Sequence, residues 1–179
     1  LLEGENAAML VDTGYGIEDV ADFMRHMTDL PLTVFLTHNH HDHAMGARCF
    51  PETYMLEADM ADWRMFTDDK MRRRVLTQAI GKNLTVDEKT FLAGEIPLPK
   101  VMKPGVIDLG GLTAEIIEAP GHTPGSAVVY VPERKLLLSG DDWNPCTWLF
   151  FPQALGLREY RSNMRGIQQL PFEKVLCPH

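Results

Sequence analysis

Apolar and polar residues follow one another along the chain in short blocks, each with the length of one strand or one helix. Residues 1–14 form two apolar runs around a polar turn, which predicts a β-hairpin. Residues 18–27 carry apolar side chains at helical spacing, and the β-branched, apolar run at 32–37 predicts a strand. An apolar strand that follows a helix indicates β-α-β alternation, in a sheet that is covered on its faces.

The middle of the chain is expected to be mainly helical. A helix is predicted to begin near Ala44, residues 53–57 have the pattern of a short strand, and residues 58–83 are expected to be helical. Residues 83–105 contain three prolines and no clear periodicity. We therefore expect a long loop there, with at most one short strand.

The last third of the chain is rich in strands. Residues 105–121 and 126–142 each predict a hairpin, and a helix at 157–170 and a short strand at 174–178 follow. Strands and helices in two successive halves predict a sandwich of two sheets with helices outside. With 179 residues, the chain is expected to form a single domain over 1–179, with short terminal segments beyond both ends.

Composition narrows the function classes. The formal net charge of −8 provides no basic field for nucleic acid or an anionic membrane, and the only basic run, Arg72 to Arg74, is interpreted as a solvated helix face. Three separated cysteines without a CxxC motif favour a reducing, cytoplasmic location. No apolar stretch approaches the roughly 20 residues of a membrane span. The expected partner is a small-molecule substrate, and a homo-oligomer is an open alternative.

One short stretch, THNHHDHAMG at 37–46, concentrates four histidines and one aspartate within six positions. His38 and His40 are two apart in an extended segment, so their side chains can point to the same side. Asp42 and His43 follow where the chain turns towards a helix, so they can face a neighbouring position. Imidazole nitrogen and carboxylate oxygen suit zinc, and iron or manganese are alternatives. A surface cluster explains poorly why these residues lie between an apolar strand and a helix start.

Three more ligand-type residues follow predicted strands. His122 comes just after an apolar run that ends at Ala119, Asp141 follows the strand at 136–139, and His179 follows the strand at 174–178. Any one of them could be incidental. Three strand ends that each finish in a residue able to bind a metal indicate a shared site.

The order of these motifs resembles the metallo-β-lactamase-fold metallo-hydrolase superfamily over nearly the whole chain, with a glyoxalase-II-like branch and an uncharacterised zinc-hydrolase branch both open. The motifs are Asp12-Thr13-Gly14, His38-x-His40-x-Asp42-His43, Gly121-His122-Thr123, Ser139-Gly140-Asp141 and a last histidine, His179. The resemblance implies the mixed α/β (α+β) class, with a four-layer αββα sandwich and metals at one edge between the sheets.

The resemblance also implies roles for single residues. By it, His38, His40 and His122 would hold a first metal, Asp42, His43 and His179 a second, and Asp141 would bridge the two. Two divalent ions are expected, zinc first, with iron or manganese as alternatives. Asp12 would support a ligand or the loop backbone. His41 is at a variable position, where lining the pocket and a role behind the ligands stay open.

The expected activity is hydrolysis by a hydroxide that bridges the two metals. Asp42 would be catalytic, because a ligand beside the nucleophile can orient it and accept its proton. A small ester, thioester or lactone with an apolar part is the expected substrate, and segments 58–100 and 143–157 are expected to select it. The alternatives are a mono-iron oxidoreductase similar to persulfide dioxygenases and a β-lactam hydrolase.

Overall fold

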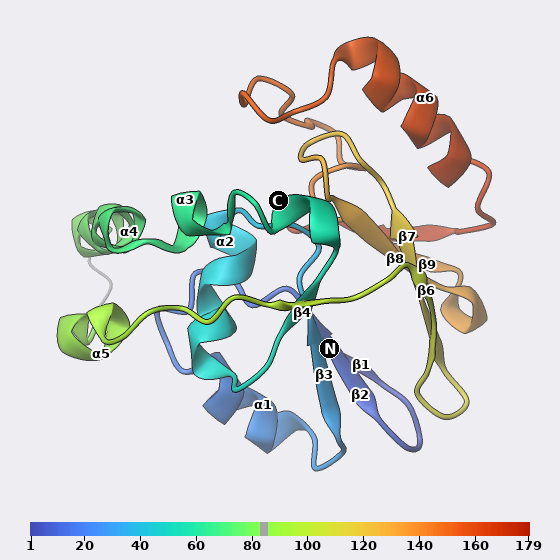
Figure 1. Ribbon diagram of the computed structural model, residues 1–179. Coiled ribbons are helices and arrows are strands. Elements are labelled where there is room, and N and C mark those ends of the chain that lie inside the picture. The colour runs from blue at the N-terminus through green and yellow to red at the C-terminus, as the bar shows by residue number, and fades with distance from the viewer. Residues whose placement is uncertain (83–85) are drawn as a thin grey trace.

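Two five-stranded β-sheets lie face to face in the computed structural model, which describes residues 1–82 and 86–179 (Figure 1). The first sheet has the order β1 (Leu2–Glu3), β2 (Ala8–Val11), β3 (Leu32–Phe35), β4 (Tyr54–Met55) and β5 (Lys100–Val101). The second has the order β10 (Lys174–Leu176), β9 (Leu136–Leu138), β8 (Ala127–Val131), β7 (Thr113–Glu118) and β6 (Gly105–Asp108).

The first sheet begins with the predicted hairpin. Strands β1 and β2 are antiparallel, with Leu2 opposite Met9. Helix α1 (Val20–Met27) then connects β2 to β3, which is parallel to it, so the predicted β-α-β alternation is confirmed. Strands β4 and β5 continue the sheet in parallel. Parallel strands leave their carboxyl ends at one edge, and β3 carries the His-rich segment there.

The second sheet contains both hairpins predicted for the last third of the chain. Strands β6 and β7 are antiparallel, and their turn requires left-handed backbone at Gly110 (φ +86°) and Gly111 (φ +66°). A Cβ atom at Gly110 would lie 2.6 Å from the side chain of Asn6, so this turn packs closely on the β1–β2 turn. Strands β8 and β9 are antiparallel, and β10 returns parallel to β9.

The core lies between the two sheets, and helices cover both outer faces. The inter-sheet cluster includes Met9, Phe35, Leu109, Ile116 and Val129. Helices α1, α3 (Trp63–Thr67), α4 (Asp69–Gly81) and α5 (Glu88–Leu92) pack on the first sheet, and α6 (Leu157–Ile167) packs on the second (Figure 1). The predicted αββα sandwich is therefore confirmed.

Some predicted elements differ in detail. Helix α5 lies in the segment 83–105, where we expected a loop; Asp87 begins it by accepting a hydrogen bond from the backbone N–H of Thr90. Phe23 and Met27 of α1 are exposed, although their spacing matches the apolar face. The helix expected near Ala44 begins earlier, as α2 (His41–Ala44). The expected helical segment 58–83 and the expected loop 83–105 both include residues from 83–85, which lie outside the described residues.

Among residues 1–82 and 86–179, no helix combines the length and the apolar character that a transmembrane span needs.

Candidate metal centre

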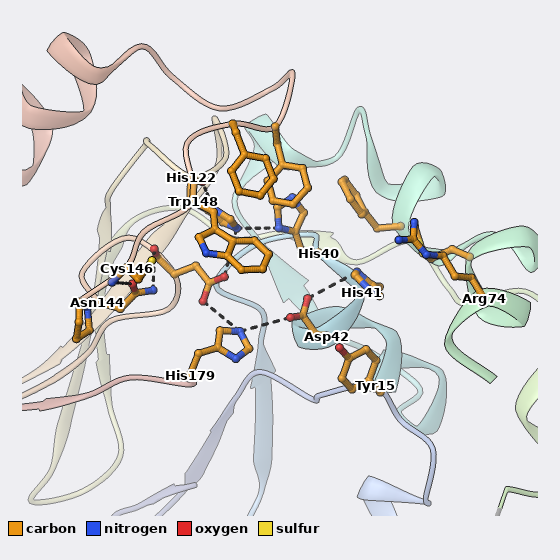
Figure 2. Close-up of a pocket in the computed structure, with 16 residues that line it drawn as sticks. Tyr15, His40, His41, Asp42, Arg74, His122, Asn144, Cys146, Trp148 and His179 are labelled. Atoms are coloured by element: carbon orange, nitrogen blue, oxygen red, sulfur yellow. Dashed lines mark hydrogen bonds and ion pairs between the residues drawn. The ribbon is translucent and has the colours of Figure 1, made fainter. Parts of the chain in front are cut away.

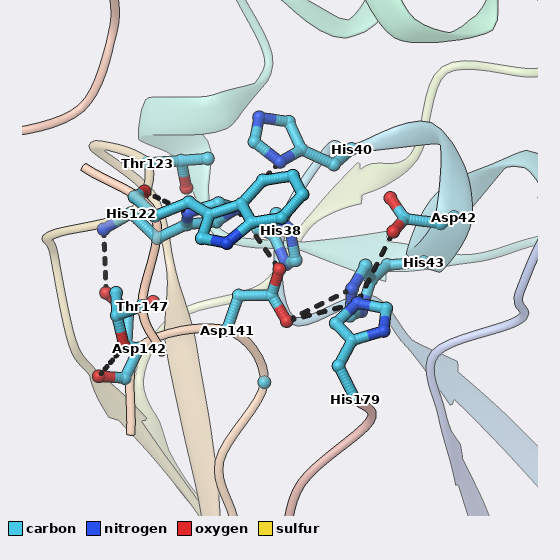
Figure 3. Close-up of polar contacts among 12 residues, drawn as sticks. His38, His40, Asp42, His43, His122, Thr123, Asp141, Asp142, Thr147 and His179 are labelled. Carbon is cyan, nitrogen blue, oxygen red and sulfur yellow. Dashed lines mark hydrogen bonds and ion pairs between the residues drawn. The ribbon is translucent and has the colours of Figure 1, made fainter. Parts of the chain in front are cut away.

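The seven predicted ligands meet at one edge of the sandwich, between the sheets (Figure 3). His38 and His40 follow β3, and Asp42 and His43 lie in the first turn of α2. The other three come from the second sheet: His122 from the β7–β8 connection, Asp141 after β9 and His179 after β10. The site therefore joins two halves of the chain that are far apart in sequence.

The ligand atoms gather in three overlapping groups that could each hold a metal ion. Within each group, one ligand atom from every residue lies within 4.8 Å of the others. The groups are His38, His40 and His122; His38, His43 and Asp141; and Asp42, His43 and His179. Hereafter the buried group is His38, His40 and His122, and the outer group is Asp42, His43 and His179.

The Asp141 carboxylate lies between the buried and the outer group. Its Oδ2 is 3.3 Å from Nε2 of His122, in the buried group. Its Oδ1 is 3.4 Å from Nε2 of His43 and 3.5 Å from Nε2 of His179, in the outer group. One carboxylate thus presents a different oxygen to each group, which is the geometry that a bridge requires.

Three buried atoms of this centre have no hydrogen-bond partner among the described residues: His38 Nε2, His43 Nε2 and Asp141 Oδ1. Buried polar atoms are nearly always paired, because leaving one unpaired costs the free energy of removing it from water. A divalent cation would pair all three. The residues present therefore fit a metal by their chemistry and by the atoms they leave free.

Hydrogen bonds behind the ligands fix which ring nitrogen is free. Nδ1 of His43 lies 2.8 Å from Oδ2 of Asp12, and a carboxylate can only accept, so Nδ1 carries a proton and Nε2 is the nitrogen left for a metal. The Thr37 hydroxyl donates to the same carboxylate at 2.9 Å and lies 3.0 Å from Nδ1 of His38. Asp12 therefore has the supporting position that the sequence predicts.

Residues of the segment 143–157 contact two of the predicted ligands, His122 and His40, and orient their rings. Nδ1 of His122 donates to the backbone carbonyl of Trp148 at 2.7 Å, which leaves Nε2 free to coordinate. The Gln153 amide lies 3.1 Å from Nε2 of His40, while Nδ1 of His40 points at Nε2 of His122 at 2.8 Å. A side-chain amide can present either its NH2 or its oxygen, so Gln153 can hold either tautomer of His40.

The electrostatics of the site favour a bound cation. Burial lowers the pKa of His38, His40 (to about 3) and His122, so all three rings are neutral, as ligands must be. Burial also lowers the pKa of His43, but the negative charges of Asp12 and Asp141 beside the ring, and its hydrogen bond to Asp12, raise it to about 10. The carboxylates that attract this proton also attract a metal ion, which would replace it.

Asp59 supports the site, and sequence reasoning missed it. Its carboxylate accepts hydrogen bonds from the backbone N–H of Asn39 (3.1 Å) and Gly125 (2.6 Å) and from the Thr123 hydroxyl (2.7 Å). It thus ties the His38–His40 segment to the loop of His122. Burial raises the pKa of Asp59, although these hydrogen bonds oppose the shift. No motif marks this residue.

Asp142 is a second missed support. It is buried, and its Oδ1 accepts the backbone N–H of His122 at 2.8 Å. Burial raises its pKa to about 7. It therefore fixes the loop of His122 and does not line the pocket, while its neighbour Trp143 packs against Phe172.

A cavity of about 830 Å³ opens over the centre (Figure 2). Five predicted ligands face it: His40, Asp42, His122, Asp141 and His179. The walls include Phe66, Met71 and Arg74 from segment 58–100, and Trp148, Phe150 and Phe151 from segment 143–157. His41 also lines the cavity, which supports the first of its two interpretations.

The chain is similar to known proteins over its whole length. The family model described as "Metallo-beta-lactamase superfamily" matches residues 1–179. The chain is 26% identical to an acyl-coenzyme A thioesterase, MBLAC2, of Gallus gallus, over 100% of this chain and 70% of that protein. It is 25% identical to a hydroxyacylglutathione hydrolase of Bartonella tribocorum, over 82% of this chain and 48% of that protein.

A solved structure agrees in fold. The di-iron-bound form of TTHA1623 superposes with a TM-score of 0.62 and 22% identity, over 94% of this chain and 80% of that one. An αββα sandwich with ligand residues of this order at one edge defines a class of metal-dependent hydrolases. The chain belongs to the metallo-β-lactamase superfamily.

Proposed function

We propose that the protein is a dinuclear metal-dependent hydrolase of small esters, thioesters or lactones that carry an apolar part. The position of Asp141 carries this proposal, because its two oxygens face two separate ligand groups. A single metal would need only one of these groups, so this position favours two metals over a mono-iron oxidoreductase.

The proposal assigns the buried group to a first metal, the outer group to a second, and Asp141 to both. Two divalent cations would supply Lewis acidity and lower the pKa of water, to about 7 for Zn²⁺. Asp42 lies in the outer group and faces the cavity, so its carboxylate can orient the attacking water and accept its proton.

Zinc is the proposed metal because histidine and aspartate are its usual ligands in catalytic sites. Iron is the main alternative, since a structural neighbour is a di-iron form. The same donors bind both metals, so the isolated protein must be analysed for each.

The proposed substrate class follows from the cavity and from the relatives. Aromatic and apolar side chains form much of the wall, and such surface accepts an acyl group by excluding water. Two relatives named for thioester chemistry favour a thioester among the three ester types.

Metal analysis combined with a substrate panel tests the proposal. Protein purified without chelator should contain two equivalents of zinc or iron and should hydrolyse at least one ester, thioester or lactone. His38→Ala should abolish turnover, because His38 belongs to two of the three groups. His26→Ala, at an exposed histidine of α1, is the matched control.

Three results would contradict the proposal. They are less than one equivalent of metal after reconstitution, turnover that His38→Ala leaves unchanged, and a panel in which a persulfide (with oxygen uptake) or a β-lactam is the only substrate consumed.

A further inference from the structure

The basic run on helix α4 contains three arginines with three different environments. Arg72 is 5% exposed, and its guanidinium donates to the carbonyls of Phe91 (3.3 Å) and Gly94 (2.7 Å) near the end of α5. Arg73 is exposed and donates to Asp69 at 2.8 Å, one turn earlier. The interpretation of the run as a solvated helix face is therefore wrong for Arg72, which joins two helices, and holds for Arg73 and Arg74, which are both exposed.

Arg74 contacts neither a backbone carbonyl, as Arg72 does, nor a carboxylate, as Arg73 does, among the described residues. Within residues 1–82 and 86–179 it forms no ion pair, and its side chain lines the cavity over the metal centre. Figure 2 shows Arg74 reaching in from the α4 side, next to His41 and across the cavity from Asn144 and Cys146. Among the described residues that line this cavity, it is the only arginine or lysine.

Another part of the cavity wall is aromatic and apolar. Trp148, Phe150 and Phe151 form a cluster with ring centroids 4.8–6.3 Å apart. Trp148 and Phe150 are more than half exposed. Exposed aromatic clusters of this kind usually mark contacts with a ligand or partner. Phe151 also packs against His40 at 4.9 Å, so the cluster reaches the metal centre. The cavity thus offers an apolar surface that reaches the metal ligands, and one arginine that forms no ion pair among the described residues.

We propose that Arg74 is a specificity-determining residue that binds an anionic group of the substrate, a carboxylate or a phosphate. The acyl chain of the substrate lies on the aromatic cluster, and the anionic group is at the opposite end. A guanidinium presents paired N–H donors that match both oxyanions. The proposal rests on the proposed function, because it places the scissile bond over the metal centre between these two contacts.

The test compares Arg74→Gln with Arg73→Gln, a matched change of an exposed arginine on the same helix. The substrates are octanoyl thioesters whose thiol part ends in a carboxylate, a phosphate or a neutral carboxamide on a spacer of constant length. Arg74→Gln should reduce the preference for one anionic thioester over the neutral one, measured as the ratio of kcat/KM values, by about tenfold. The loss should come from KM, and Arg73→Gln should leave the ratio unchanged.

The two anionic substrates separate the two sources of negative charge. A larger loss with the carboxylate or with the phosphate identifies the group that Arg74 binds. An unchanged ratio for both in Arg74→Gln, or an equal loss in Arg73→Gln, would overturn the proposal.

A binding measurement separates this proposal from the hydrolase. Uncleavable thioether analogues of the three substrates are titrated into the protein as purified, with its metal, and Trp148 in the wall reports their binding by fluorescence. Trp148→Phe identifies its part of the signal. Anion binding about tenfold weaker in Arg74→Gln supports the anchor even if no thioester is hydrolysed. Hydrolysis together with anion binding that does not depend on Arg74 supports the hydrolase and overturns the anchor.

Discussion

The buried and the outer ligand groups are built from the same residue types, yet the chain supports them differently. Exposed fractions are 0% for His38 and 1% for His122 in the buried group, but 55% for the side chain of His179 in the outer group. Every ring of the buried group also has a second contact at its other nitrogen. Among the described residues of the outer group, only His43 has one. Fixed rings lose less freedom on binding, so we expect the buried group to bind its metal first and more tightly.

The largest expected effect comes from removing a ligand of the buried group. His122→Ala should lower the metal content from two equivalents to one at most, and kcat/KM by a thousandfold or more, because Lewis acidity at the scissile bond is lost. Metal analysis and hydrolysis assays measure both. His26→Ala should change neither, and two equivalents retained in His122→Ala would contradict the assignment.

The next largest effect is on stability. Asp59→Ala leaves buried N–H groups of Asn39 and Gly125 unpaired, so the free energy of unfolding should fall by about 3 kcal/mol. Denaturant unfolding measures this change. Glu57→Ala, at an exposed carboxylate two residues earlier, should stay within about 0.5 kcal/mol of the parent. An equal loss of unfolding free energy in the two variants would contradict the role of Asp59 in joining the loops of the buried group.

Asp12→Asn separates the two groups by affinity. Asparagine tolerates the left-handed backbone at this position (φ 60°), but it removes the charge behind His43. The affinity of the outer group should fall about 10- to 100-fold, and that of the buried group should fall less, because Asp12 reaches His38 only through Thr37. Competition with a metal chelator resolves the two steps, and an equal fall in both would show that the support is shared.

The smallest effect is expected at Gln153. Gln153→Ala removes the amide beside His40, and the buried group should lose about tenfold in metal affinity. The same chelator competition measures it, with the exposed Gln169→Ala as control. A parent-like affinity would mean that the contact of Gln153 with His40 is not used when metal is bound.

Much of the fold follows from local pattern, which is why it could be predicted. The hairpins, the β-α-β unit and α6 each show their periodicity within one short window of sequence. Helix α5 was missed because its five residues are too few to show a period. Phe23 and Met27 of α1 match the apolar spacing but face solvent, because only Ala21 and Met24 reach the buried side.

The ligands could be predicted because their order along the chain is a motif, whereas their supports have none. Asp59 is 64 residues from Thr123, and Gln153 is 113 residues from His40. These contacts arise only when the two sheets meet. The same holds for Arg72 and Arg74, which are near neighbours in sequence but lie in a helix junction and a cavity wall. Sequence pattern could not separate their roles.

Anomalous diffraction from crystals of the metal-loaded protein, at the zinc and iron absorption edges, tests the central claim most directly. The account predicts two peaks, one against His38, His40 and His122 and one against Asp42, His43 and His179, with Asp141 bound to both. A single peak at full metal loading, with Asp141 directed away from it, would contradict a dinuclear centre.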